Sequence, residues 1–398
     1  MSSWKECTLA EITSILGDGL HGTPNYDKNG EYFFINGNNL SNGKIIIKSD
    51  TKRADISEYT KYKKNLNDRT ILVSINGTLG NIALYNNEKC ILGKSACYFN
   101  VNDDVDKYFI KYVVTNKDFQ EYIRNFATGT TIPNVSLKTM REYSFFLPPL
   151  EEQKAIAEVL SSLDDKIDLL HRQNQTLESL AQTLFRQWFI EEAKEEWEEI
   201  KLGDFVDCIT GYSYKSNDLN DSKNALVTLK NFARDGSFRL DGFKEFIGTK
   251  YKDSQIVKHG DLVVSHTDIT QEADIIGNPV LVVDMGKYDN LIITMDLMKV
   301  ESKVDWLSKE FLYYLFRTED FKFHCLGNSN GTTVLHMSRK TIPEYKTKIP
   351  NIEKIEEFTS DVKEILQKQY VNILQIQTLE NLRDTLLPKL LSGEVKVK

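Results

Sequence analysis

Residues 129–143 read GTTIPNVSLKTMREY, and residues 331–345 read GTTVLHMSRKTIPEY. The two stretches align without a gap, and the same offset continues to the run QTLE, which occurs at 175–178 and again at 377–380. Chance does not produce a match of this length and order. The chain therefore contains an internal repeat, and the repeat decides how the fold must be organised.

Weaker matches of the same kind precede these segments. The spacing W-x4-L begins at Trp4 and again at Trp197, and ILVS at 71–74 corresponds to LVVS at 262–265. The match fades between these points, so the globular parts have diverged more than the segments that follow them. The sequence predicts two copies of one unit, each a divergent globular part followed by a better-preserved tail.

The first tail, after Pro149, carries the pattern of a coiled-coil seam. Apolar side chains recur at steps of four and three at Ile156, Leu160, Leu163, Ile167, Leu170, Leu177, Ala181, Leu184 and Trp188. Asn174 fills the one polar position, where an Asn commonly fixes register but could equally be solvated. Pro149, Glu151 and Glu152 suit a helix start. We expect a helix over about 151–192, roughly 60 Å long at ~1.5 Å per residue.

The second tail begins in the same way but is more polar in its middle. Its seam positions are Phe358, Val362, Ile365, Gln369, Asn372, Ile376, Leu379, Leu386 and Leu390. Pro388 should kink or end the helix, and Ser392-Gly393 supplies a stop. For both tails the expected role is a structural helix pair.

Connectivity predicts how these parts are arranged. The second globular part begins at the far end of the first helix and feeds the second helix with almost no linker, so the helices should be antiparallel. We expect globular domains at 1–148 and 195–350, a first helix at 149–194, and a second helix with the C-terminal tail at 351–398. Two similar domains would then lie at opposite ends of a long antiparallel two-helix coiled coil, related by a pseudo-two-fold axis.

Within the globular parts the sequence favours a mixed α/β (α+β) fold. Strand-like runs are FFI at 33–35, KIII at 44–47, ILVSI at 71–75 and NIALY at 81–85, separated by Gly and Asn turns. Residues 107–125 space their aromatic side chains as a helix does.

Composition limits the broad class of protein. The 398 residues, 40% hydrophobic and 27% charged, are enough for two ordinary globular domains. No run of about 18 apolar residues occurs, and the start MSSWKECTLA lacks the apolar core of a signal peptide, so we expect a cytoplasmic protein without a membrane span. The five cysteines form no C-x-x-C pair, which predicts buried, reduced thiols rather than disulfides or a zinc site.

The net charge of −8 is unevenly distributed along the chain. Residues 151–196 hold 5 basic and 11 acidic side chains, whereas residues 1–150 hold 18 basic and 16 acidic ones. Local basic stretches remain in the globular parts. A weak or assisted binder of nucleic acid is therefore allowed, and an autonomous high-affinity binder is disfavoured.

Sequence signatures of catalysis are missing. The only Pro-Pro lies in LPPL, so there is no Asn/Asp-Pro-Pro-aromatic loop of an adenine methyltransferase. No G-x-x-x-x-G-K-[S/T] phosphate loop and no H-E-x-x-H metal motif occur. We therefore expect a non-catalytic chain without a metal site.

The order and duplication of these motifs resemble the specificity (S) subunits of type I restriction-modification systems over essentially the whole chain. The resemblance rests on W-x4-L-x-E/D, GTPNYDKNGEYFFINGNNLSNGKI at 22–45, ILVSINGTLGNIAL at 71–84, and GTTIPNVSLKTMREYSFFLPPLEEQKAIAEVLSSLDDKI at 129–167. Each motif alone is weak, but their order and repetition are specific.

The resemblance implies that the globular parts are two target-recognition domains, each reading one half of a split site in double-stranded DNA. The paired helices would act as a ruler and as the dock for two methyltransferase subunits, through which restriction subunits join. No cofactor is implied for this chain, whereas S-adenosylmethionine, ATP and Mg²⁺ are expected on the partner subunits.

Candidate DNA-binding residues follow from side-chain chemistry, because polar loop residues can hydrogen-bond bases or phosphates. In the first globular part the candidates are His21, Thr23, Asn25, Tyr26, Asn36, Asn38, Asn39, Lys44, Ser74, Asn76 and Thr78. In the second they are Tyr212, Tyr214, Lys215, Lys230, Asn231, Arg234, Ser265, His266 and Thr267. Each of these could instead be an ordinary solvated loop residue.

Alternatives remain open from the sequence. The GTT segment could be a turn that locks each globular part to its helix, or it could face DNA. The chain as a whole could be a non-catalytic coiled-coil scaffold without DNA reading, or a self-sufficient enzyme, although the missing methyltransferase loops count against the latter. The sequence alone does not reveal which bases are recognised.

Overall fold

The computed structural model describes residues 4–270, 272–332 and 334–397. The chain divides into two compact units: unit 1 is Met1–Leu169 with Gln377–Lys398, and unit 2 is Leu170–Ile376. Each unit contains one globular head and a part of both long helices. The mixture of helices and sheets agrees with the predicted α/β (α+β) class.

The head of unit 1 is built around a four-stranded antiparallel sheet in the order β2-β10-β7-β8. Its strands are β1 (Lys5–Thr8), β2 (Thr13–Asp18), β3 (Tyr32–Ile35), β4 (Leu40–Ser41), β5 (Lys44–Ile45), β6 (Arg53–Ala54), β7 (Thr70–Asn76), β8 (Thr78–Leu84), β9 (Cys90–Leu92), β10 (Ala96–Val101) and β11 (Ser144–Leu147). Its short helices are η1 (Gly37–Asn39), α1 (Ile56–Tyr62), α2 (Lys107–Thr115), α3 (Lys117–Asn125) and α4 (Leu137–Glu142).

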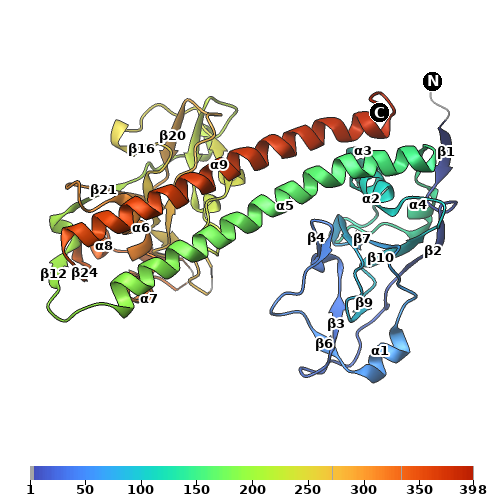
Figure 1. The fold of residues 1–398 in the computed structure, drawn as a ribbon, viewed down its shortest axis with the longest axis horizontal. Helices are drawn as coiled ribbons and strands as arrows, with labels where there is room; N and C mark the ends of the chain where they lie inside the picture. Colours follow the sequence, from blue (N-terminus) through green and yellow to red (C-terminus); the bar gives the residue numbers. More distant parts are fainter. Residues whose placement is uncertain (1–3, 271, 333, 398) are drawn as a thin grey trace. The chain divides into compact units, whose positions relative to one another are not determined.

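Strand β7 shows why ILVSI is almost continuously apolar. Ile71 and Val73 join the core cluster that contains residues of α2 and α3, whereas Leu72 packs on the opposite face with residues of β3 and β9. Successive side chains of a strand point to opposite faces, so a strand covered on both sides needs apolar residues throughout. Figure 1 shows α2 and α3 beside this sheet.

The head of unit 2 repeats this plan with a four-stranded sheet in the order β13-β21-β17-β19. Its strands are β12 (Glu198–Lys201), β13 (Val206–Thr210), β14 (Asn224–Val227), β15 (Lys244–Glu245), β16 (Ile256–Val257), β17 (Leu262–Ser265), β18 (Thr267–Asp268), β19 (Pro279–Leu281), β20 (Asn290–Ile293), β21 (Leu297–Ser302), β22 (Ser329–Asn330), β23 (Leu335–Met337) and β24 (Lys346–Ile349). Its short helices are η3 (Leu202–Asp204), η4 (Ser216–Asp218), η5 (Leu229–Asn231), η6 (Leu240–Gly242), η7 (Asp253–Gln255), α6 (Lys309–Leu315), α7 (Glu319–Gly327) and α8 (Thr341–Glu344).

The two heads close in the same way. In unit 1 the first strand, β1, pairs antiparallel with β11, and in unit 2 β12 pairs antiparallel with β24. Leu9 N–H donates to the Tyr143 carbonyl, and Leu202 N–H donates to the Tyr345 carbonyl, at 3.0 Å in both cases. The Leu that ends each W-x4-L motif is therefore hydrogen-bonded to the Tyr that ends each repeated segment. This contact joins the point where the chain enters each head to the point where it leaves.

Two long helices follow the heads: α5 (Leu150–Arg186), continued by one π-helical turn, η2 (Gln187–Glu191), and α9 (Ile352–Leu391). The expected helix over 151–192 is confirmed to within a residue at each end. Pro388 lies inside α9, and the helix continues to Leu391 rather than ending at the proline. The stop is Gly393, which has φ of 72° and donates its N–H to the Leu390 carbonyl.

In unit 1, α5 and α9 pack antiparallel against the head. Ile156 and Leu160 of α5 share one core cluster with Leu387 and Leu390 of α9. Asp164 joins three elements, because its carboxylate accepts from Lys111 Nζ at 2.6 Å, Tyr112 OH at 2.7 Å and Arg383 Nη1 at 3.1 Å.

In unit 2 the pairing is again antiparallel. Phe185 of α5 packs against Phe358 of α9, with ring centroids 5.5 Å apart. Here Glu178 is the bridging carboxylate, which accepts from Tyr314 OH at 3.4 Å and Gln369 Nε2 at 3.3 Å, and lies 3.5 Å from Arg317 Nε.

Three strand predictions are confirmed, and two predicted elements differ. FFI and ILVSI fall in β3 and β7, and NIALY falls in β8 except for Tyr85, which follows its last residue. Of KIII, only Lys44 and Ile45 form a strand. Residues 107–125 form two helices rather than one, because Asn116 ends α2 with ψ of 149° and its side chain caps Lys117 N–H.

Candidate nucleic-acid interface

A polar loop follows β2 in unit 1 and carries four of the predicted residues. His21, Thr23, Asn25 and Tyr26 are all exposed. His21 Nε2 lies 2.6 Å from Asp18 Oδ2, and Asn25 is held by Glu58, which accepts from its backbone N–H at 2.8 Å and from Nδ2 at 3.3 Å. The loop thus presents polar side chains from an ordered backbone.

The second group, Asn36, Asn38 and Asn39, surrounds the turn η1. Asn39 is 5% exposed, its Oδ1 accepts from Asn36 N–H at 3.0 Å, and its Nδ2 donates to the Ile46 carbonyl at 3.0 Å. Asn39 therefore stabilises the turn and is not available to a ligand in this structure. Asn36 is half-buried, with Oδ1 accepting from Ser95 Oγ at 2.9 Å, and Asn38 is exposed.

The predicted residues in or near β5, β7 and β8 also include both buried and exposed side chains. Ser74 is fully buried and its hydroxyl accepts from Asn81 N–H at 2.8 Å, so its role is internal. Asn76 is half-buried and Thr78 is exposed. Lys44 is exposed and forms an ion pair with Asp168 of α5, which directs this side chain toward the helix.

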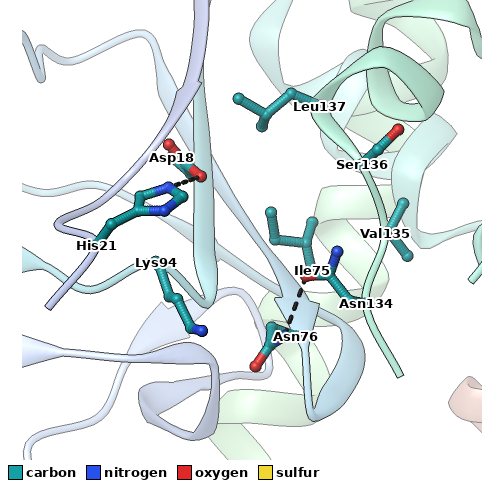
Figure 2. Close-up of a pocket in the computed structure, with 9 residues that line it drawn as sticks. All are labelled: Asp18, His21, Ile75, Asn76, Lys94, Asn134, Val135, Ser136 and Leu137. Atoms are coloured by element: carbon teal, nitrogen blue, oxygen red, sulfur yellow. Dashed lines mark hydrogen bonds and ion pairs between the residues drawn. The ribbon is translucent and has the colours of Figure 1, made fainter. Parts of the chain in front are cut away.

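In unit 1, residues 128–134 form a hairpin around Gly129-Thr130-Thr131, called the GTT hairpin below. A pocket of about 330 Å³ lies where the end of β7 meets this hairpin. It is lined by Asp18, His21, Ile75, Asn76, Lys94, Asn134, Val135, Ser136 and Leu137. Figure 2 shows these side chains, with the His21 ring beside Asp18 and Lys94 on the same side of the pocket. Polar and charged side chains make up most of the lining, and His21, Lys94, Asn134 and Ser136 are exposed.

The GTT hairpin forms one wall of this pocket. Thr128 and Asn134 pair across it, and Asn134 also pairs with Asn76, whose Nδ2 donates to Asn134 Oδ1 at 3.0 Å. Gly129 has φ of 92°, a conformation that favours glycine, and Thr130 and Thr131 are exposed at the tip. The residues after the hairpin make the exit from the head, since Ser136 caps α4 and β11 pairs with β1.

Sequence reasoning found His21 and Asn76 in this pocket but missed Asp18, Lys94 and Asn134. Asn134 lies inside the repeated segment and corresponds to His336 in the second copy. A polar position that differs between two otherwise similar copies was a visible sign of a functional residue. Lys94 carried no comparable signal, because it stands outside every repeated motif.

In unit 2 the predicted residues of the first loop are largely packed against neighbours. The Tyr212 ring lies 5.5 Å from the Phe246 ring, and Tyr214 OH accepts from Lys244 Nζ at 2.9 Å. Lys215 and Lys230 are exposed. Tyr212 and Tyr214 are therefore held by neighbouring side chains, whereas Lys215 and Lys230 remain accessible.

Two further candidates of unit 2 differ in their accessibility. Asn231 is fully buried, its Oδ1 accepts from Thr228 N–H and its Nδ2 donates to the Arg239 carbonyl, both at 2.8 Å. It repeats the structural role of Asn39. Arg234 is exposed, with Nε 3.4 Å from Asp274 Oδ2.

The last three candidates lie where β17 continues into β18. Ser265 is fully buried and its hydroxyl donates to the Ile275 carbonyl, so it is structural like Ser74. Thr267 is 3% exposed, and its Oγ1 lies 3.2 Å from His336 Nδ1. Burial, followed by the nearby Arg339 and His336, lowers the pKa of His266, which keeps this imidazole neutral.

Neither a metal centre nor a membrane span is found in the described part of the chain. Across residues 4–270, 272–332 and 334–397, no group of three His, Cys, Asp or Glu side chains is arranged to hold a metal ion. Within those same ranges, every helix is too short or too polar to span a bilayer. Thr333 of the second GTT lies outside the described residues.

Comparison with known proteins identifies the family. The model of the type I restriction modification DNA specificity domain matches residues 1–179 and again residues 194–386. The chain belongs to this family. The double match follows the internal repeat, with one specificity domain for each copy.

Individual relatives agree with this assignment. The type I restriction enzyme MjaIX specificity subunit of Methanocaldococcus jannaschii is 24% identical over 354 residues, which cover 83% of this chain and 78% of the relative. The putative MjaX specificity subunit of the same organism is 23% identical over 425 residues, covering 99% and 94%. The crystal structure of the S subunit from M. genitalium has the same fold, with a TM-score of 0.60, 19% identity, and coverage of 98% and 96%.

The predicted resemblance is therefore confirmed. As a type I specificity subunit, the chain supplies DNA sequence recognition and not catalysis. A scaffold without DNA reading and a self-sufficient enzyme both disagree with membership of a DNA specificity family.

Proposed function

We propose that this specificity subunit reads a bipartite site in double-stranded DNA, with one half-site for each head. The observation that carries the proposal is the repeated head, in which the same strand order and the same entry and exit contacts present different polar loops. A reader of two different half-sites needs a common scaffold and two different surfaces. The exposed candidates His21, Thr23, Asn25 and Tyr26 in unit 1 and Lys215, Lys230 and Arg234 in unit 2 belong to such loops.

The proposal assigns the two long helices to spacing and docking. In it, α5 and α9 form one antiparallel coiled coil with a head at each end, so that the coil sets the spacer between the half-sites. Two methyltransferase subunits dock on the helices, and restriction subunits join through them. The acidic excess of residues 151–196 suits a protein-facing rather than a DNA-facing surface, because acidic side chains repel phosphates.

The chemistry of modification and cleavage belongs to the partners in this proposal. S-adenosylmethionine, ATP and Mg²⁺ would bind there, and the complex would act in the cytoplasm. The isolated chain should show little or no methylation, because the sequence lacks the loops of an adenine methyltransferase. It should bind a specific sequence only feebly, because its net charge is negative.

The test is an exchange of one head. Residues 1–145 are replaced by the first head of another family member, and the methylated sequences of cells carrying the chimera with its partners are mapped. One half-site should change while the other half-site and the spacer stay the same. A change in both half-sites would contradict independent reading by the two heads.

A further inference from the structure

The pocket-forming junction of unit 1 has a counterpart in unit 2 with the same backbone contacts. In unit 1, Asn76 pairs with Asn134, and Val135 N–H donates to the Ile75 carbonyl at 2.8 Å. In unit 2, Thr267 pairs with His336, and Met337 N–H donates to the His266 carbonyl at 2.9 Å. The end of β7 therefore meets Asn134 and Val135 in the same register in which the residues after β17 meet His336 and Met337.

The backbone around Leu20 and Lys94, which forms a third wall of this junction in unit 1, also has a counterpart in unit 2. Lys94 N–H donates to the Leu20 carbonyl at 3.0 Å, and Met295 N–H donates to the Tyr212 carbonyl at 2.9 Å. Just before these acceptors, a Cβ on Gly19 would lie 2.2 Å from the Leu92 carbonyl oxygen, and one on Gly211 would lie 2.2 Å from the Thr294 oxygen. The same tight approach of two backbones thus fixes this wall in each head.

The side chains on this common backbone differ at most positions. The pairs, unit 1 first, are Asp18 and Thr210, His21 and Ser213, Ile75 and His266, Asn76 and Thr267, Lys94 and Met295, Asn134 and His336, and Leu137 and Arg339. The residues that hold the backbone are instead kept, as Ser74 and Ser265, Asn39 and Asn231, and Ser136 and Ser338 show.

The best-preserved segment contains both conservative and non-conservative exchanges, and the pairs Leu137/Arg339 and Arg141/Pro343 are of the second kind. Ile132 and Val334, and likewise Met140 and Ile342, exchange one apolar side chain for another. Asn134 and His336 exchange one exposed polar side chain for another with different hydrogen-bonding atoms. A constant frame with a variable polar position is the arrangement that two readers of different bases require.

The hydrogen bonds of the pair leave groups that suit base edges. The bond from Asn76 Nδ2 to Asn134 Oδ1 does not use Asn134 Nδ2 or Asn76 Oδ1, which together offer a donor and an acceptor. This is the pattern with which amides recognise N7 and N6 of adenine. In unit 2, Thr267 Oγ1 lies 3.2 Å from His336 Nδ1. In the tautomer in which Nδ1 accepts from this hydroxyl, His336 Nε2–H is a donor. Together with the guanidinium of the exposed Arg339, it matches the O6 and N7 acceptors of guanine.

We propose that Asn134 in unit 1 and His336 in unit 2 are specificity-determining residues that contact base edges of their respective half-sites. Asn134 with Asn76 favours an adenine, and His336 with Arg339 favours a guanine. The proposal rests on the proposed function, in which each head reads one half-site.

The experiment uses the full chain assembled with its methyltransferase partner. Duplex libraries are randomised in one half-site at a time, and the bases enriched by binding are sequenced for wild type, Asn134→His and His336→Asn. Asn125→His is the matched control, because Asn125 is an exposed residue of the same unit that does not line the pocket. Co-purification with the partner and the unfolding temperature verify that each variant is folded.

The expected result is local. Asn134→His should reduce the preference for adenine at one position of one half-site by roughly tenfold, with the other half-site unchanged. His336→Asn should alter a guanine in the opposite half-site, and Asn125→His should alter neither. Since the two variants lie in different heads, failure of one to fold still leaves the other as a test.

Two results would overturn the proposal. One is unchanged enrichment in both half-sites for folded, assembled variants, and the other is loss of preference in both half-sites from a single variant. Failure of the proposed function looks different, because the wild-type complex would then enrich no bipartite sequence at all.

Discussion

Asn372 Nδ2 donates to Asn174 Oδ1 at 2.8 Å across the two long helices of unit 2. Gln369 completes the cluster, since its Nε2 donates to the Asn174 carbonyl at 3.1 Å and its own carbonyl accepts from Asn174 Nδ2 at 3.3 Å. The polar seam positions of the two tails therefore face one another. A one-turn slip would place each amide against apolar side chains, so the cluster selects the observed register.

The Asn174–Asn372 pair should show opposite effects of single and double replacement. Asn372 is fully buried, and Asn174→Ala would leave its amide without this partner, lowering the free energy of unfolding by about 1–3 kcal/mol. Asn174→Leu with Asn372→Leu removes both polar groups together, so stability should be unchanged or higher. Thermal and urea unfolding of the three proteins measures both effects. A double variant less stable than Asn174→Ala would contradict this account.

The Asp164 carboxylate should make stability depend on pH at the acid end. Burial alone would raise the pKa of Asp164, but Lys111, Tyr112 and Arg383 outweigh burial and hold this pKa below its usual value. A lowered pKa means that the folded state binds the proton less readily than the unfolded state. The resulting stability is present above the unfolded-state value of about 4 and is lost as pH falls through the lower folded-state value.

Asp164→Asn should remove this contribution. At pH 7 we expect a loss of roughly 1–3 kcal/mol, less than for a fully buried pair because the Asp164 side chain is 25% exposed. Urea unfolding from pH 7 to pH 3 should show the wild-type and variant curves converging as pH falls. Asp165→Asn, on an exposed neighbour, is the control, and a constant difference at every pH would contradict the assignment.

If the helices set the spacer, lengthening them should lengthen it. Seven residues inserted after Leu170 in α5 and after Ile376 in α9 preserve the seam and add about 10 Å at ~1.5 Å per residue. At about 3.4 Å per base pair the spacer should grow by roughly three base pairs, with both half-sites unchanged. That change also rotates one half-site by roughly 100°, so activity should fall.

The spacer in the surviving methylation is therefore the measurement. Insertion into α5 alone is the control, because it breaks the pairing and should destabilise the chain. An unaltered spacer in a folded, partner-bound double insertion would exclude the helices as the ruler.

The cysteine thiols should be unreactive in the folded chain. Burial raises the pKa of Cys7 to about 11 and those of Cys90, Cys208 and Cys325 to about 12, so little nucleophilic thiolate forms at pH 8. Ellman's reagent should react slowly before unfolding and with all five thiols in denaturant. Cys208, which is the least buried, should react first, and a rapid full reaction in native buffer would contradict these environments.

The helices were the most predictable part of the molecule. Ile156, Leu160 and Phe358 belong to a repeating apolar pattern with helical spacing, which predicts a helix with one buried stripe. All three side chains are buried as expected. The strand ILVSI was predictable for a similar reason, since a short run that is mostly apolar and rich in Ile and Val favours a strand covered on both faces.

The site was less predictable because polarity in a sequence does not reveal where a side chain is used. Asn38 and Asn39 are adjacent and chemically identical, yet their side chains differ in use. Asn38 is exposed, whereas the side chain of Asn39 is hydrogen-bonded within the turn that it stabilises. Ser74 looked like a loop hydroxyl but closes an internal hydrogen bond. Lys94 lines the pocket, and its backbone N–H donates to the carbonyl of Leu20, a residue far away in the sequence. No local sequence pattern announces such a contact.

The division of the chain into units has a consequence for its synthesis. The core of unit 1 includes Leu387 and Leu390 of α9 together with Ile156 of α5. The ribosome makes Ile156 before the stretch Leu170–Ile376, which forms unit 2, and makes Leu387 and Leu390 after it. At about 5–20 residues per second, the ribosome needs roughly 10–40 s to make that intervening stretch. During this delay the nascent first head exposes the apolar surface that α9 later covers, and unit 2 has its whole sequence available first. Shortened chains that end before Leu387 should therefore leave the first head open and prone to capture by chaperones.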